Sequence, residues 1–147
     1  MGEASYSNRF RLACRRAANV MYDMWLERGH SDTRLLLPPL IPDDVVTVGS
    51  SVAGAETKEH IIPRKVIVDK CHEIFRNGGY ADDAEALIIE NLRIAWISKE
   101  EAERLNKSKN LNLRQRMPEG WSFETGDKYA RLTMADIELL ADDGQPE

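Results

Sequence analysis

The chain has 147 residues, of which 42% are hydrophobic and 31% charged, a composition ordinary for a globular protein with a hydrophobic core. Its formal net charge of -5 means that it can bind nucleic acid only if its basic residues are concentrated on one surface. No apolar run approaches the roughly 20 residues of a membrane span, and the N-terminus carries no secretory signal pattern. We therefore expect a cytoplasmic protein without a membrane partner.

The two cysteines, Cys14 and Cys71, lie far apart in the sequence and belong to no Cys-x-x-Cys pair. Two thiols without neighbouring ligands cannot build a structural zinc site, so no structural zinc is expected. In a reducing cytosol we expect both thiols to be free and buried.

Residues Asn8 to Arg28 are predicted to form an amphipathic helix, which Ser7 or Asn8 caps and Gly29 ends. Its apolar residues recur at i, i+3, i+4 and i+7 and form one stripe: Phe10, Ala13, Cys14, Ala17, Val20, Met21, Met24 and Trp25. Such a stripe is most often part of a core. A long terminal helix can also hold a homodimer together or bind a partner protein.

Residues His30 to Lys58 contain three closely spaced prolines, which exclude a helix there. Val45 to Val48 is a candidate strand that precedes a turn at Gly49 to Ser51. This stretch either wraps over the core or forms a mobile loop. The first helix and most of this stretch make an N-terminal segment, residues 1–55.

Beyond Pro63 the pattern predicts helices and one short strand. The expected elements are helices from Arg64 to Arg76 and from Ala81 to Asn91, a strand from Arg93 to Ile97, a helix from Ser98 to about Lys107, and a short helix from Met134 to Leu140. A turn is expected at Met117 to Trp121, and residues 142–147 should be frayed. The fold class predicted is α+β, as a mostly helical single domain.

The run Glu59-His60-Ile61-Ile62-Pro63 places an acid beside a histidine where a strand is about to end. A neutral imidazole at His60 can take the proton of an attacking water, and the Glu59 carboxylate is a hard oxygen ligand for Mg²⁺ or Mn²⁺. Adjacent residues of a strand point to opposite faces, so these two can share a metal only at an irregular or terminal position, which Pro63 supplies. The alternative for His60 is a structural histidine near the start of the next helix.

Asn91 ends the second of these helices, where asparagine is a common C-cap, and directly precedes the strand. The ordered set of Glu59–Pro63, Asn91-Leu92, strand and helix resembles the HNH (His-Me finger, ββα-metal) nucleases. In that family the acid binds one divalent metal ion, the histidine activates water, and the asparagine positions the histidine-bearing loop. The resemblance implies a ββα-metal-like core within residues 56–141, a Mg²⁺ or Mn²⁺ cofactor, His60 and Asn91 as catalytic residues, and Glu59 as a metal ligand.

The final helix departs from the family pattern, which places a histidine or an asparagine about one turn in as a further metal ligand. The helix from Ser98 to Asn106 contains no histidine. Glu100 or Glu101 can take its place, since carboxylates suit Mg²⁺ at least as well as imidazole does, and Glu101 is the second candidate metal ligand. Ser98 and Glu101 also match a capping box, which needs no metal. Asn106 lies further along the helix and is a weaker candidate.

The resemblance covers residues from Glu56 to about Leu140, with two additional helices between His60 and Asn91. Two later segments, Met117 to Trp121 and Ala130 to Leu132, resemble packing features of an HNH-like subgroup found in bacterial and phage open reading frames.

Candidate phosphate contacts are Arg64, Arg93 and Arg104. Basic residues also gather in two segments, one from Arg9 to Arg16 and one that holds Arg104, Lys107, Lys109, Arg114 and Arg116. Charge runs of this kind usually form solvated faces, and the net charge of -5 counts mildly against a nuclease that grips DNA unaided.

Two functional hypotheses follow. The first is an HNH-like, metal-dependent endonuclease or nickase that acts on DNA. The second is a non-catalytic phage or mobile-element protein on the same skeleton, which inhibits a host defence complex such as a CRISPR effector by binding it; an acidic surface can imitate phosphate charge. A dimeric structural protein that uses the first helix is a third, plainer possibility.

Overall fold

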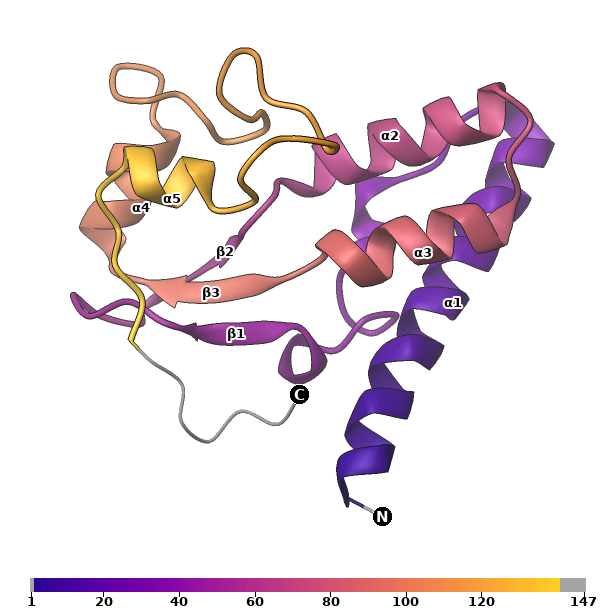
Figure 1. Cartoon of the computed structure of the whole chain (residues 1–147), viewed down its shortest axis with the longest axis horizontal. Helices are drawn as coiled ribbons and strands as arrows, with labels where there is room; N and C mark the ends of the chain where they lie inside the picture. Colours follow the sequence, from indigo (N-terminus) through magenta and orange to yellow (C-terminus); the bar gives the residue numbers. More distant parts are fainter. Residues whose placement is uncertain (1, 141–147) are drawn as a thin grey trace. The chain divides into compact units, whose positions relative to one another are not determined.

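The structure, a computed structural model, describes residues 2–140 of the chain and the side chains of residues 8–140. About half of the chain is helical, and the remaining regular structure is one small sheet, so the fold class is α+β (Figure 1). In chain order the elements are α1 (Gly2–Arg28), the 3₁₀ helices η1 (Thr33–Leu36) and η2 (Asp43–Val45), β1 (Thr47–Ser50), β2 (Thr57–His60), α2 (Arg64–Arg76), α3 (Ala81–Asn91), β3 (Ile94–Ile97), α4 (Lys99–Asn106) and α5 (Ala130–Met134). None of the helices in this described part is both long and apolar enough to cross a membrane.

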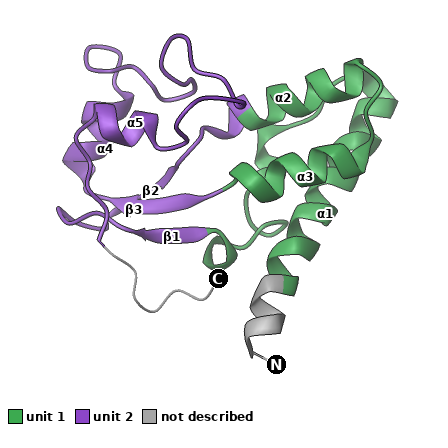
Figure 2. Ribbon diagram, in the orientation of Figure 1, with its two compact units in different colours: residues 1–46, 67–92, 146–147 green, residues 47–66, 93–145 purple. Residues whose placement is uncertain are grey.

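The chain packs into two compact units (Figure 2). Among the described residues, unit 1 comprises residues 2–46 and 67–92, and unit 2 comprises residues 47–66 and 93–140. Helix α3 packs against α1, so the helices between β2 and β3 belong largely to unit 1. The division into residues 1–55 and 56–141 stays a prediction. The tail expected to be frayed, residues 142–147, lies outside the described residues.

Unit 1 is built around the predicted apolar stripe of α1. Four residues of the stripe are fully buried, Ala13, Cys14, Ala17 and Met21, and so is the neighbouring Ala18. Further along α1, the rings of Tyr22 and Trp25 pack against Phe75 of α2, with ring centroids 5.0 and 5.9 Å apart. These contacts confirm that the stripe is a core face of unit 1.

The ends of α1 show which local signals are strong. Gly29 adopts a positive φ of 78°, and its N–H donates to the Trp25 carbonyl at 2.8 Å, so the helix ends as predicted. The predicted start is wrong, because the helix begins at Gly2 and Ser7 and Asn8 lie within it. Polar residues that can cap a helix also tolerate its interior, so they mark a start only weakly.

Helices α2 and α3 have the predicted boundaries. Gly78 follows α2 with a φ of 96°, and the N–H groups of Gly78 and Gly79 donate to the carbonyls of Phe75 and Ile74. Both cysteines are buried thiols outside any disulfide, as expected. Burial raises the pKa of the Cys71 thiol to about 12, so this thiol stays protonated and unreactive near neutral pH.

Unit 2 contains a three-stranded sheet in the order β1-β3-β2, with β3 parallel to β1 and antiparallel to β2. The central strand is the most apolar, and its residues Ile94, Ala95 and Ile97 are buried. In the β2–β3 register Glu59 lies opposite Ala95 and His60 opposite Ile94. The strand predicted at Val45 to Val48 is shifted, since Val45 ends η2 and β1 starts at Thr47.

The core of unit 2 lies among the sheet, α4, α5 and the segments that follow these helices: Ile61, Ala95, Ile97, Leu105, Leu113, Leu132, Ala135 and Ile137. The last helix is displaced from the prediction of Met134 to Leu140, because α5 ends at Met134 and Asp136 adopts a φ of 58°. Leu139 instead forms a β-bridge with Ser51. The turn predicted near Trp121 is confirmed, since the Trp121 N–H donates to the Pro118 carbonyl at 3.1 Å.

Candidate functional site

Glu59 lies near the end of β2 and is buried, with 9% of its surface exposed. Each of its carboxylate oxygens accepts a hydrogen bond within unit 2. Oε2 accepts from Nη2 of Arg131 at 2.8 Å, and Oε1 accepts from Nδ2 of Asn106 at 3.1 Å. Asn106 is the last residue of α4, so the carboxylate joins the sheet to the ends of two helices.

Arg131, on α5, is fully buried. Its Nε donates to the Leu113 carbonyl at 2.8 Å, and its Nη1 donates to the carbonyls of His60 and Ile61 at 2.7 and 3.3 Å. Its Nη2 donates to Glu59 and, at 3.3 Å, to Oδ1 of Asn106. Burial lowers the pKa of the guanidinium from its usual value, while the charge and the hydrogen bond of Glu59 raise it. An arginine stays protonated in such surroundings, so this is a buried ion pair.

His60 is the last residue of β2, at the strand end where the sequence placed it, and it is half-buried. The hydrogen bond from Arg131 to its backbone carbonyl fixes the backbone at this position. His60 and Glu59 are therefore held at the same strand end by the same arginine.

Asn91, the predicted orienting residue, is the last residue of α3 and is 5% exposed. Its Nδ2 donates to the Leu87 carbonyl at 2.9 Å, one turn back in the same helix, and Leu92 takes the C-cap position. Asn91 belongs to unit 1, whereas His60 belongs to unit 2. The orienting role of Asn91 stays a prediction.

Glu101 forms the capping box that the sequence allowed. Its Oε1 accepts the backbone N–H of Ser98 at 2.8 Å, and the Ser98 hydroxyl accepts the Glu101 N–H at 3.1 Å. Its Oε2 accepts the hydroxyl of Ser51 at 2.8 Å, and the residue is 4% exposed. The buried carboxylate of Glu101 thus fixes the start of α4 and ties it to the segment after β1.

The residues at this site do not fit a resident divalent ion as they are arranged. Glu59 and Glu101 have different partners, and all four of their carboxylate oxygens already accept a hydrogen bond. Within the part of the chain that the structure describes, no cluster of three His, Cys, Asp or Glu side chains could hold a metal. The Arg131 guanidinium also lies 2.8 Å from Oε2 of Glu59, so a second cation at this carboxylate would be repelled by it.

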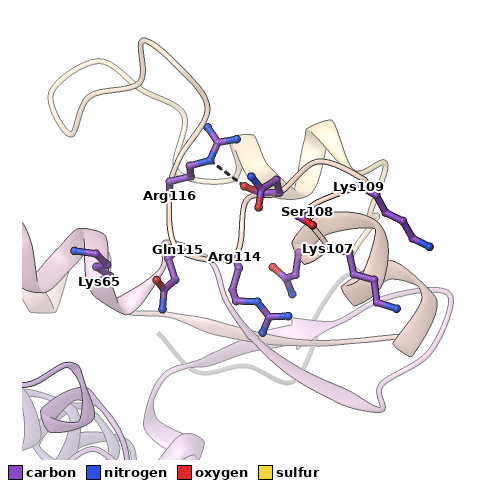
Figure 3. A pocket seen from close by; sticks show the side chains of 9 residues that line it. Lys65, Lys107, Ser108, Lys109, Arg114, Gln115 and Arg116 are labelled. Atoms are coloured by element: carbon purple, nitrogen blue, oxygen red, sulfur yellow. Dashed lines mark hydrogen bonds between the residues drawn. The ribbon is translucent and has the colours of Figure 1, made fainter.

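A cationic pocket opens next to this network in unit 2 (Figure 3). It has a volume of about 750 Å³ and is lined by five basic residues, Lys65, Lys107, Lys109, Arg114 and Arg116, together with Asn106, Ser108, Asn112 and Gln115. None of the described residues that line it is acidic. Because Asn106 also contacts Glu59, the pocket and the buried ion pair share one side chain.

The chain after α4 brings these cations together. Asn112 adopts a φ of 58°, and the Leu113 N–H donates to the Leu105 carbonyl at 2.9 Å, which folds the segment back onto the helix. Arg116 is oriented by a hydrogen bond from its Nε to the Asn112 carbonyl at 2.9 Å. Residues 104–116 contain five basic residues and no acidic one, which was the sequence signal for this pocket.

The three arginines predicted to contact phosphate lie outside the pocket lining. Arg64 begins α2, Arg93 precedes β3, and Arg104 uses its Nε to donate to the Ala135 carbonyl at 2.7 Å. Lys65, one residue after Arg64, lines the pocket instead and was not singled out from the sequence.

Charge is segregated between the two units. Residues 47–66 and 93–140 contain 12 Lys and Arg and 10 Asp and Glu, a net charge of +2. Residues 8–46 and 67–92 contain 8 Lys and Arg and 11 Asp and Glu, a net charge of -3. The acidic balance of the whole chain therefore does not exclude a polyanion as the ligand of unit 2.

No protein-family model, no curated protein and no solved structure matches the chain. The resemblance to HNH nucleases therefore stays a prediction from the sequence.

Proposed function

We propose that this protein binds DNA by its phosphate backbone in the cationic pocket of unit 2, on an HNH-like skeleton. The proposal rests on one observation: five lysine and arginine side chains line the same pocket, and none of the described residues in its lining is acidic. Phosphate neutralisation and the release of counterions supply most of the free energy of non-specific DNA binding.

The remaining lining of the pocket suits the same ligand. Ser108, Asn112 and Gln115 offer hydroxyl and amide groups, which donate hydrogen bonds to phosphate and sugar oxygens in many protein–DNA interfaces. The two arginines can bind a phosphate with two parallel N–H groups, while the lysines act as mobile point charges. These contacts read the backbone and not the bases, so little sequence preference is expected.

Neutralising two pocket lysines, in the variant Lys107→Gln/Lys109→Gln, should weaken the binding of a DNA duplex by roughly ten- to sixtyfold in 0.1 M salt, because two phosphate contacts are lost. Fluorescence anisotropy with a labelled oligonucleotide measures the dissociation constant.

The matched control is Lys99→Gln/Lys128→Gln, which removes two positive charges of the same unit from outside the pocket lining. This control should retain most of the affinity. Equal losses in the two double variants would contradict a site in the pocket, and preferential binding of RNA would reassign the ligand.

An HNH-like endonuclease or nickase is a second candidate, and the position of His60 favours it. His60 ends β2 beside the Glu59 network, with β3 and α4 following in the order that the resemblance requires. In this role the DNA backbone would be held by the pocket cations, and the neutral imidazole of His60 would accept the proton of the attacking water.

Plasmid nicking separates the two candidates. If the protein only binds DNA, supercoiled plasmid stays intact with wild-type protein and with His60→Ala in the presence of Mg²⁺ or Mn²⁺. If it is a nickase, the wild type produces open circles and His60→Ala loses this activity by at least about a hundredfold, the usual contribution of a general base. The anisotropy assay shows whether His60→Ala still binds the duplex.

A further inference from the structure

Arg131 is surrounded by oxygen atoms in a way that resembles the coordination of a metal ion. Its three nitrogens donate to five oxygens at 2.7 to 3.3 Å: one carboxylate oxygen of Glu59, one amide oxygen of Asn106, and the backbone carbonyls of His60, Ile61 and Leu113. Carboxylate, amide and backbone carbonyl oxygens are the ligands that bind hard divalent cations in proteins. Here they converge on a guanidinium.

This arrangement links four segments that are distant in the sequence. The oxygens come from the end of β2 and the turn after it, from the last residue of α4, and from the segment before the Trp121 turn, while the cation comes from α5. No buried side-chain nitrogen or oxygen in the described residues lacks a hydrogen-bond partner. A guanidinium has five N–H groups in a fixed plane, so it can cross-link several oxygens as a metal ion does.

The charge balance around Arg131 makes the binding of a further cation by the same oxygens unfavourable. The single negative charge of Glu59 is compensated by the buried Arg131, and the other four acceptors are neutral. A divalent ion among these oxygens would lie beside the positive guanidinium, and no additional carboxylate is present to compensate the added charge. Such a contact is unfavourable at low dielectric.

We infer that Arg131 is the resident cation of this site, and that its guanidinium holds a set of oxygens that would otherwise suit a divalent metal ion. Arg131 is a positioning residue in this account, because it holds Glu59, Asn106 and the His60 backbone in place. The inference concerns the structure around Glu59 and does not depend on whether the pocket binds DNA.

Manganese binding tests the inference on the complete chain. In NMR spectra of the wild type, added Mn²⁺ should leave the resonances of Glu59, Asn106 and Arg131 without paramagnetic broadening, and neither Mn²⁺ nor EDTA should shift the melting temperature. Broadening centred on Glu59 and Asn106 in the wild type would overturn the inference, and this measurement needs no variant to fold.

Removing the guanidinium should make these oxygens available to a divalent ion. In Arg131→Ala, the oxygens of Glu59 and Asn106 are left without their cation, so Mn²⁺ should raise the melting temperature, and the additional change Glu59→Gln should abolish that rise. Arg104→Ala is the matched control, since it removes an arginine that contacts a backbone carbonyl of the same unit, and it should gain no response to Mn²⁺. A folded Arg131→Ala that does not respond to Mn²⁺ would contradict the idea that the arginine stands in place of a metal.

Discussion

Replacing Arg131 with methionine is expected to lower the free energy of unfolding by about 3–5 kcal/mol, the usual cost of leaving one partner of a buried ion pair uncompensated. The variant keeps much of the aliphatic volume but leaves the Glu59 carboxylate buried without its cation. It also removes the donors of the carbonyls of His60, Ile61 and Leu113. Urea denaturation followed by circular dichroism measures the change, with the slope of the transition as a check on two-state behaviour.

Arg104→Met is the matched control for this result. Arg104 also donates to a backbone carbonyl, that of Ala135, but in the described part of the chain it forms no ion pair with a buried carboxylate. Its loss should cost only about 1 kcal/mol, the net contribution of a typical hydrogen bond. Similar losses in the two variants would mean that the Glu59–Arg131 pair contributes no more than a single ordinary hydrogen bond.

The affinity for a DNA duplex should fall steeply as salt is added. If each of the five pocket cations neutralises one phosphate, the slope of the logarithm of the binding constant against the logarithm of the salt concentration approaches about -4.5. Affinity would then drop roughly 500-fold between 50 and 200 mM salt. Anisotropy titrations at four or five salt concentrations give this slope directly.

The same titrations identify which cations take part. Lys107→Gln/Lys109→Gln should make the slope less negative by about 1.8, because two phosphate contacts are lost. Lys99→Gln/Lys128→Gln should leave the slope nearly unchanged. A wild-type slope near zero would show that the pocket makes no phosphate contacts and would remove the main support for DNA binding.

The elements that the sequence predicted correctly are those with a local signal at each end. Helix α2 follows Pro63 and is stopped by Gly78, which takes the positive φ that glycine adopts without strain. The capping box of Ser98 and Glu101 is also local, since its partners are one turn apart. By contrast, the predicted start of α1 and the predicted position of α5 were wrong. At these points no residue excludes either the helical or the non-helical conformation.

The candidate site was predicted in part. The sequence predicted that a strand ends at His60 and that basic residues gather between Arg104 and Arg116. Both features belong to short segments, in which spacing and charge are visible directly. The role of Glu59 could not, because its partners Asn106 and Arg131 come from distant parts of the chain.

Short-range patterns were enough to predict the fold class and the boundaries of α2 and α3, because hydrophobic period, turn residues and caps act over a few neighbouring residues. Three features needed the folded chain: the cation beside Glu59 is an arginine, Glu101 contacts Ser51 as well as its own helix, and five basic residues line one pocket. Burial and charge compensation depend on contacts between segments that are distant in the sequence, and a local sequence pattern does not predict such contacts.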